Sequence, residues 1–251
     1  MHNVTAPQGF IFFDELAIRV DAPHMGAHRG TRVLAWAHRF RLLLWLWLRD
    51  QGPRLRRAID VVAAGMAVIL ALPILLIAAL AVKLSSRGPL LYMQERIGKD
   101  GRPFSLKKFR SMVVDAEARK TALALQCPEA MDGVRFKLRR DPRLTRVGGW
   151  LRRSSIDELP QLFNVLRGEM TLVGPRPPVR REVVEYDPAA LRRLEVLPGL
   201  TCLWQIRGRS ELSFAQQVAL DVEYIDTVRP VDEIGIVLKT VPAVLGGRGA
   251  Y

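Results

Sequence analysis

VVAAGMAVILALPILLIAALAV, residues 61–82, is an uncharged stretch of this 251-residue sequence. As a helix rising about 1.5 Å per residue, it is long enough to cross the hydrocarbon core of a bilayer, roughly 30 Å. Basic residues flank it on both sides: Arg54, Arg56 and Arg57 come before it, and Lys83 and Arg87 come after it. Because positively charged flanks prefer the cytoplasmic side of a membrane, this pattern favours keeping both ends on that side.

A proline stands at the midpoint of the apolar stretch. Pro73 removes a backbone hydrogen bond from a helix and kinks or breaks it. Two half-helices that dip into the membrane and return would satisfy both the proline and the basic flanks. From these features alone a re-entrant and a spanning helix are equally supported, and the core helix of a soluble protein ranks third.

The composition is that of a folded protein with an anionic partner. Apolar residues make up 49% of the chain and charged residues 25%, while the net charge is +13. A surplus of this size predicts binding to nucleic acid, anionic lipid or a phosphorylated substrate.

The residue types available for chemistry are few. All four histidines lie within the first 38 residues, so the rest of the chain has no imidazole for acid–base catalysis or metal binding. The two cysteines, Cys127 and Cys202, cannot form a disulfide framework or a four-ligand zinc site, which favours a reducing compartment. Carboxylates, arginines and lysines remain as the candidate catalytic groups.

The hydropathy pattern divides the chain into three parts. Residues 1–53 form an N-terminal extension, in which the Leu/Trp-rich run 42–48 suits either a helix at the membrane interface or an amphipathic helix of a soluble fold. Residues 54–87 contain the membrane segment. Residues 88–251 form the third part, which we expect to be a cytosolic domain that carries the candidate catalytic groups.

The downstream part is predicted to be mainly helical with a small β-hairpin, an α/β fold. The hairpin pairs LLYMQERI with PFSLKKFRSM through the turn Lys99-Asp100-Gly101-Arg102, in which Asp-Gly is the turn pair. The apolar periodicity predicts helices over residues 113–126, 147–153, 158–166 and 212–227.

The segment LRRSSIDELPQLFNVLRGEMTLVGPRPP, residues 151–178, holds the strongest candidate site. Asp157 and Glu158 are adjacent carboxylates at a predicted helix start, where the simplest role of Asp157 is to cap the helix. Arg152 precedes them, and Arg176 lies in a loop stiffened by three prolines, which suits bidentate phosphate recognition. Since a helix start also keeps a carboxylate ionised, capping and nucleophilic roles are compatible, and the set suits phosphoryl transfer.

These segments together resemble the bacterial sugar transferases, the monotopic phosphoglycosyl transferases that begin the assembly of capsules, exopolysaccharides and glycans. The resemblance covers the chain from about Arg54 to its end. It is carried, in family order, by RAIDVV, GPLLYMQERIG, FSLKKFRSM, DPRLTRVGGWLRRSSIDELPQLFNVLRGEMTLVGPRPP and PGLTCLWQIRGRS.

The resemblance implies roles for individual residues. It makes Asp157 the nucleophile, assigns Mg²⁺ coordination to Glu158, and makes Arg152 and Arg176 phosphate contacts. It also implies a re-entrant membrane helix broken at Pro73, and so a monotopic membrane protein. Further polar residues lie in matching motifs: Gln94, Arg96, Lys108, Arg110 and Asn164. Arg96, Lys108, Arg110 and Asn164 are candidates for binding substrate phosphate, and for each of the five a structural or surface role is equally supported.

The sequence departs from the family pattern at three places. Leu72 precedes Pro73 where smaller members carry serine, which puts the depth and geometry of the membrane break in doubt. Cys202 stands where glycine is usual, and residues 120–135 match no motif of the family. The large multi-helix extension of the longest members is missing, so we expect a near-minimal catalytic unit.

The resemblance implies a UDP-sugar donor, an undecaprenyl phosphate acceptor and a location on the cytosolic face of the bacterial inner membrane. A nucleic-acid-binding protein is the alternative that the charge allows, but the basic runs lack stacking aromatics, so we expect no nucleic acid. A catalytically silent membrane adaptor is a further alternative, against which the intact Asp157–Glu158 pair argues. A homo-oligomer stays open.

Overall fold

The computed structural model describes residues 29–127, 131–132, 135–136, 138, 141–208, 211–227 and 230–245. The chain divides into two compact units, Met1–Asp50 and Gln51–Tyr251. In the first unit, residues 29–50 are helical. Their side chains lie outside the described part, and so does the predicted interfacial position of residues 42–48.

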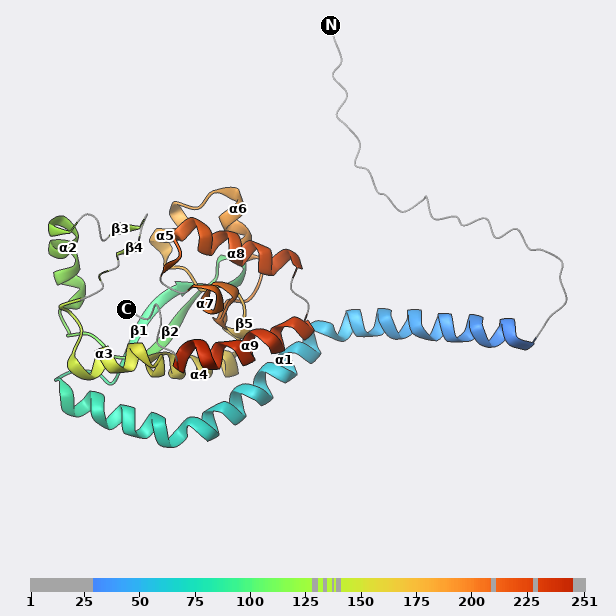
Figure 1. The fold of residues 1–251 in the computed structure, drawn as a ribbon, viewed down its shortest axis with the longest axis horizontal. Coiled ribbons are helices and arrows are strands. Elements are labelled where there is room, and N and C mark those ends of the chain that lie inside the picture. Colours follow the sequence, from blue (N-terminus) through green and yellow to red (C-terminus); the bar gives the residue numbers. More distant parts are fainter. Residues whose placement is uncertain are drawn as a thin grey trace, which may run out of the picture. The chain divides into compact units, whose positions relative to one another are not determined.

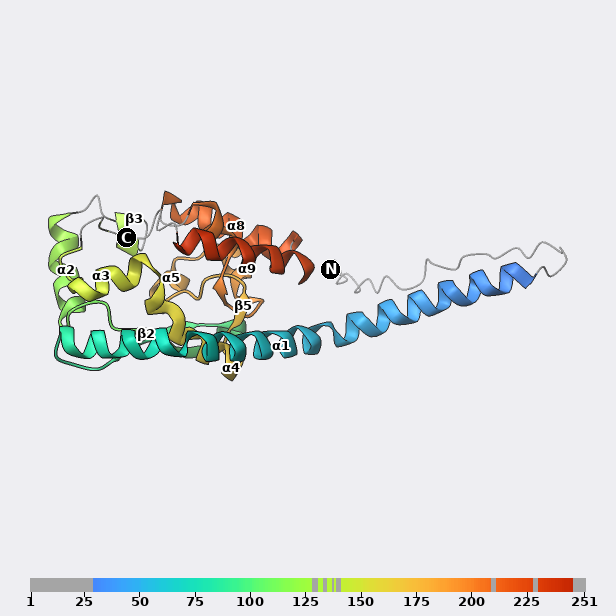
Figure 2. The same cartoon turned by 60° about the horizontal axis from the view of Figure 1, so that its bottom comes forward.

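Helix α1, Arg29–Ser85, contains the apolar stretch. Its part Gly52–Ser85 is long and apolar enough to cross a membrane. Pro73 lies inside the helix, and the ribbon curves along its apolar part without a break (Figure 1, Figure 2). The predicted break is not present: the helix continues through Pro73, because a proline removes one backbone hydrogen bond and the neighbouring turns keep theirs. The re-entrant path stays a prediction.

One face of the apolar part of α1 is buried along its length. The buried residues Asp60, Ala64, Leu75, Ala78 and Val82 recur at helical spacing, so they form one stripe. Ala64 packs in a cluster with residues of β2 and α4, and Val82 packs in a second cluster that includes Phe109 and Leu151. The part of the chain that follows α1 therefore holds both ends of this part of the helix.

The rest of the helix surface is apolar and exposed. Only 17% of its most apolar window is buried, which does not fit the core helix of a soluble protein. The large apolar side chains that are more than half exposed are Leu55, Ile59, Val62, Met66, Ile69, Leu70, Leu76, Ile77, Leu80 and Leu84.

Polar contacts attach the start of the apolar part of α1 to the rest of the domain. Arg57 donates hydrogen bonds of 2.6 and 3.0 Å to the carbonyl oxygens of Val165 and Leu166, in the last turn of α4, Leu162–Arg167. A guanidinium there satisfies carbonyls that have no partner within their own helix and opposes the negative end of the helix dipole.

Asp60 makes the second fastening. Its carboxylate accepts hydrogen bonds from the hydroxyl of Thr171 at 2.6 Å and from the backbone N–H of Leu172 at 3.2 Å. Because Asp60 is only 6% exposed, the pair of bonds compensates the burial of a charged group. Both polar residues of the segment RAID, Arg57 and Asp60, therefore contact the folded domain. Many of the apolar side chains that follow them in α1 lie on its exposed face.

The predicted hairpin is confirmed. Strand β1, Leu91–Ile97, pairs antiparallel with β2, Pro103–Phe109, across the short 3₁₀ helix η1, Lys99–Gly101. Asp100 and Gly101 both have positive φ, 57° and 73°, as the Asp-Gly pair of a tight hairpin turn requires.

Two further strand pairs were not predicted. One is the antiparallel pair of β3, Met131–Asp132, with β4, Arg135–Phe136. β5, Thr171–Val173, runs parallel to β6, Gly199–Thr201. A Cβ atom on Gly199 would overlap the backbone of Gly174, so only glycine lets the two chains approach this closely. This contact places the start of the proline-rich loop beside the start of β6.

The remaining elements surround the hairpin and the strand pair (Figure 1). The helix predicted over 147–153 is confirmed, and the helices predicted over 113–126 and 212–227 begin later than expected. The helix predicted over 158–166 is instead a 3₁₀ helix, Ile156–Gln161, followed by α4, Leu162–Arg167. The elements are α2 (Ala116–Gln126), β3 (Met131–Asp132), β4 (Arg135–Phe136), α3 (Arg146–Arg153), η3 (Ile156–Gln161), α5 (Arg180–Val184), α6 (Pro188–Leu191), η4 (Arg192–Leu194), α7 (Leu203–Arg207), α8 (Phe214–Thr227) and α9 (Pro230–Leu245).

Candidate functional site

Asp157 lies in the first turn of η3, directly after a sharp change of chain direction. Ser155 is the N-cap and has a left-handed conformation, with φ at 53°. The expectation that Asp157 caps a helix is therefore wrong by two positions, because the chain leaves α3 through the strained Ser155 and starts a 3₁₀ turn there. The carboxylate of Asp157 is thus not required as the cap.

Burial sets the electrostatics of Asp157. The residue is 6% exposed, and burial raises the pKa of its carboxyl to about 6. Lys108 and Arg152 oppose this rise in pKa, and the neighbouring Glu158 adds to it. Near neutral pH the carboxylate is mostly ionised and more basic than an exposed aspartate, which suits a nucleophile.

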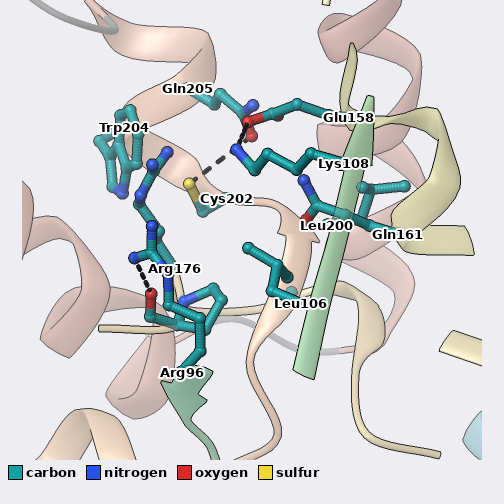
Figure 3. A pocket seen from close by; sticks show the side chains of 12 residues that line it. Arg96, Leu106, Lys108, Glu158, Gln161, Arg176, Leu200, Cys202, Trp204 and Gln205 are labelled. Atoms are coloured by element: carbon teal, nitrogen blue, oxygen red, sulfur yellow. Dashed lines mark hydrogen bonds and ion pairs between the residues drawn. The ribbon is translucent and has the colours of Figure 1, made fainter. Parts of the chain in front are cut away.

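Lys108 joins the hairpin to the two carboxylates. It extends from β2 so that its Nζ atom lies 2.6 Å from Oε1 of Glu158 (Figure 3). Both side chains are mostly buried, with exposed fractions of 17% and 19%. Burial lowers the pKa of Lys108, and the charge of Glu158 opposes that shift.

Arg176 supplies a cation without a fixed anion. Its guanidinium lies over the ring of Trp204, 5.8 Å from the ring centroid. Within the described part of the chain, no side-chain or backbone oxygen accepts a hydrogen bond from this guanidinium. It lines a pocket that Lys108 and Glu158 also line (Figure 3), so its donors are available to a bound anion.

The loop that carries Arg176 is held from two sides. Arg96 donates to the carbonyl oxygen of Pro177 at 2.8 Å, and Arg193 donates to the carbonyl oxygen of Arg176 itself at 3.1 Å. Arg193 in turn forms an ion pair of 2.7 Å with Asp221 of α8, and both side chains are fully buried. The position of Arg176 therefore depends on α8.

Sequence reasoning did not identify Arg193 or Asp221 as contributors to the site. Neither residue lies in the segment 151–178, and their pairing depends on tertiary packing that no local pattern reports. Trp204 and Gln205, which line the cleft, were also missed as site residues. Both residues lie in the motif PGLTCLWQIRGRS, in which the tripeptide LWQ combines an aromatic ring with an amide, and this combination could have marked them as site residues.

The other predicted phosphate contacts differ in their surroundings. Arg152 lines the cleft and donates to the hydroxyl of Ser111 at 3.0 Å. Arg110 also lines the cleft, but it donates to the carbonyl and hydroxyl oxygens of Ser86, at 2.7 and 2.9 Å. Arg110 therefore fastens the segment that leaves α1.

Arg96 is committed to protein contacts. Besides its bond to the proline loop, it donates two hydrogen bonds to Oε1 of Gln94, at 3.0 and 2.6 Å. Arg96 lines the cleft, but only 8% of its surface is exposed.

Asn164 does not reach the cleft. It is fully buried, its side chain accepts from the backbone N–H of Lys107, and it donates to Ser105 and Glu169. The predicted phosphate contact is corrected accordingly: the amide joins α4 to β2, and every polar atom of its side chain is occupied.

The site is one cleft of about 460 Å³. Asp157 and Glu158 lie in it beside Lys108, and basic side chains line much of the remainder. The lining cations are Arg96, Lys108, Arg110, Lys120, Arg143, Arg152, Arg176 and Arg181.

The carboxylates present fit a magnesium ion that is shared with a substrate. Among the described residues, no group of three or more His, Cys, Asp or Glu side chains could hold a metal ion. Mg²⁺ usually keeps several waters and binds through one or two carboxylates and substrate phosphates. Glu158, adjacent to Asp157, could supply such a carboxylate, while a diphosphate would supply the other oxygens.

Comparison with known proteins assigns a family to this arrangement. The sequence model described as "Bacterial sugar transferase" matches residues 52–247, which include α1 from its apolar part onward and the whole cleft.

Curated relatives agree with that match. The exopolysaccharide production protein ExoY of Rhizobium meliloti is 43% identical over 206 residues, which are 81% of this chain and 91% of the relative. The UDP-glucose:undecaprenyl-phosphate glucose-1-phosphate transferase of Caulobacter vibrioides is 42% identical over 221 residues, 82% of this chain and 78% of the relative. The undecaprenyl-phosphate galactose phosphotransferase of Salmonella typhimurium is 39% identical over 78% of this chain but 42% of its own length.

The raised pKa of Asp157 predicts how its replacement changes stability with pH. A folded-state pKa of about 6, above the unfolded value, means that ionisation costs stability, and this cost develops as pH rises from about 4 to 6. Asp157→Asn should therefore gain stability relative to wild type between pH 4.5 and pH 7.5, on the order of 1–3 kcal/mol. Unfolding in detergent at both pH values measures the gain.

Asp226→Asn is the control of opposite sign. Asp226 is exposed, and its hydrogen bond with Arg192 lowers the pKa of its carboxyl. This variant should lose stability relative to wild type as pH rises. An equal response of the two variants would show that the site does not raise the pKa of Asp157.

Proposed function

Because the chain belongs to the bacterial sugar transferase family, we propose that it transfers a sugar-1-phosphate from a UDP-sugar to undecaprenyl phosphate and releases UMP. Relatives named as transferases of glucose-1-phosphate and as galactose phosphotransferases acting on undecaprenyl phosphate support this reaction class. The observation that carries the proposal is the buried carboxylate of Asp157, which lies in one cleft with Arg176, whose guanidinium is available to an anion.

In the first step, a carboxylate oxygen of Asp157 attacks the β-phosphorus of the UDP-sugar. A bond forms between that oxygen and phosphorus, and the bond from phosphorus to the bridging oxygen breaks, so that its electron pair leaves with UMP. Arg176 and Arg152 stabilise the charge on the phosphoryl oxygens, because preorganised donors in a cleft cost no reorganisation during the reaction. A phospho-sugar ester on Asp157 results.

In the second step, a phosphate oxygen of undecaprenyl phosphate attacks the same phosphorus. The bond to Asp157 breaks, the carboxylate is regenerated, and the product is an undecaprenyl diphosphate sugar. The overall reaction needs no oxidant, reductant or water.

A magnesium ion would be held by Glu158 together with the diphosphate of the donor. Bound there, it would neutralise charge on the diphosphate and help UMP to leave. The residues of the chain orient the phosphates around it: Arg176 from the proline loop, Lys108 from β2, and Arg152 from α3.

The enzyme lies on the cytosolic face of the bacterial inner membrane as a monotopic protein, with the exposed face of α1 in contact with lipid. A helix that crosses a bilayer is surrounded by lipid or by other spanning helices. Here one catalytic domain contacts the buried stripe of α1 from Asp60 to Val82, which supports a path that enters and leaves on the same side. The acceptor's phosphate, at headgroup level, then lies near the cleft.

The nucleophile is tested by Asp157→Asn. An amide has no ionised oxygen to attack phosphorus, so the release of UMP should fall by several orders of magnitude while the protein stays folded. Wild-type protein given a labelled UDP-sugar without lipid acceptor should accumulate label on Asp157, and the variant should accumulate none. A panel of UDP-sugars would identify the donor in the same assay.

Asp187→Asn is the matched control. Asp187 is an aspartate at the start of α6, where its side chain accepts a hydrogen bond from the backbone N–H of Ala190. This variant should release UMP at nearly the wild-type rate. Retention of most activity by Asp157→Asn would exclude the covalent mechanism.

Arg176→Lys should be severely impaired although the positive charge is retained. An ammonium group cannot make the two-pronged contact of a guanidinium with phosphate, and we expect a loss in kcat of about 100-fold or more. Arg180→Lys, four positions along and paired with Glu95 at the surface, should keep its activity. Near-normal kcat for Arg176→Lys would reduce its role to general charge.

The membrane path is tested by cysteine labelling of a variant that lacks Cys127 and Cys202. Arg54 and Arg87 flank the apolar stretch and are exposed, so Arg54→Cys and Arg87→Cys can report on their side of the membrane. In sealed inside-out vesicles an impermeant maleimide should label both positions. Labelling of only one of them would indicate a helix that crosses the bilayer.

A further inference from the structure

The ion pair between Lys108 and Glu158 occupies the carboxylate that a metal ion would need. Nζ of Lys108 lies 2.6 Å from Oε1 of Glu158, and both groups are largely shielded from water (Figure 3). A Mg²⁺ ion coordinates a carboxylate oxygen at about 2.0–2.1 Å. A Mg²⁺ ion on this oxygen would lie close to the ammonium group, and repulsion between the two cations would oppose its binding while Lys108 stays in place.

The surrounding charges add to this competition. Arg96 and Arg176 line the same pocket as Lys108, so a dication arriving alone would enter a region that already holds several positive charges. Shielding from water makes repulsion between like charges stronger than it is at an open surface. The protein alone therefore offers a poor site for a free divalent cation.

A diphosphate changes this balance. Its negative oxygens can accept hydrogen bonds from Lys108 and Arg176, which gives the ammonium group a second partner and releases the oxygen of Glu158. The metal ion and the diphosphate then favour each other's binding, and thermodynamic linkage requires that the effect is equal in both directions.

We propose that Lys108 acts as a placeholder for the divalent cation, so that Glu158 binds the metal ion only together with the diphosphate of the donor. The inference rests on the proposed function for the identity of that diphosphate. Its consequence is that the free enzyme keeps the carboxylates of Asp157 and Glu158 without a metal ion, and the nucleophile remains unneutralised until the donor arrives.

The test uses Mn²⁺ as the probe and the full-length protein in detergent, without nucleotide, and follows free Mn²⁺ by electron paramagnetic resonance. Wild type should bind Mn²⁺ weakly. Lys108→Met, which fills the same volume without the charge, should bind at least about tenfold more tightly. The gain should disappear when Glu158→Gln is added to Lys108→Met.

The neighbouring residue provides a matched control. Lys107 is also mostly buried on β2, but it pairs with Glu169 at 3.9 Å and does not line the cleft. Lys107→Met should bind Mn²⁺ as weakly as wild type. Lys108→Arg, which keeps the charge, should also remain weak.

Two further measurements keep the result independent of folding and of turnover. Thermal unfolding of Lys108→Met should shift upward with Mn²⁺, whereas wild type should shift only when UDP is also present. Tight, Glu158-dependent binding of Mn²⁺ to wild type without nucleotide would overturn the proposal, and so would a gain in Lys108→Met that survives Glu158→Gln. These measurements need no sugar transfer, so a failure of UMP release would refute the proposed function separately.

Discussion

The packing of one face of α1 against the catalytic domain is the constraint on which the rest of the structure depends. A buried stripe from Asp60 to Val82 ties the domain to the helix, and the opposite face keeps large apolar side chains exposed. Arg57 and Asp60 fix the orientation of the domain on the helix, because Arg57 binds backbone carbonyls of α4 and Asp60 binds the hydroxyl of Thr171 in β5. The domain therefore cannot turn freely about the apolar helix. Under the proposed monotopic placement, this packing would set the height of the cleft relative to the lipid headgroups.

The cleft concentrates charges that would repel one another without support. Arg96 and Arg193 carry part of that support, since they bind the backbone of the loop that holds Arg176. The fully buried pair of Arg193 and Asp221 is a weak source of net stability, because desolvation offsets much of the attraction. Its evident effect is to fix geometry: because its backbone is held, Arg176 keeps its position without an acceptor among the described residues.

The sequence predicted features that depend on local chemistry. The Asp-Gly turn, the glycine that ends α4 and the proline-stiffened loop each follow from backbone preferences of a few residues, and the structure brings Asp157, Glu158, Lys108 and Arg176 into one cleft as the family resemblance implied. The failures were tertiary. Asn164 has a side-chain amide that could donate to phosphate, yet it is fully buried between α4 and β2. The β5–β6 pair joins two three-residue strands far apart in sequence, and such short segments carry no periodicity.

The division of the cations into held and available groups bears on how two anionic substrates can use one site. Arg96 and Arg110 donate mainly to oxygens of the protein, whereas Arg176 has no acceptor among the described residues and Lys108 has a carboxylate that it could exchange for a phosphate. Under the proposed reaction, the phosphate of UMP and the phosphate of the lipid acceptor would use Arg176, Lys108 and Arg152 in turn, so UMP leaves before the acceptor is aligned. A covalent phospho-sugar on Asp157 meets that requirement, because it keeps the transferred group in place while the cations change partners.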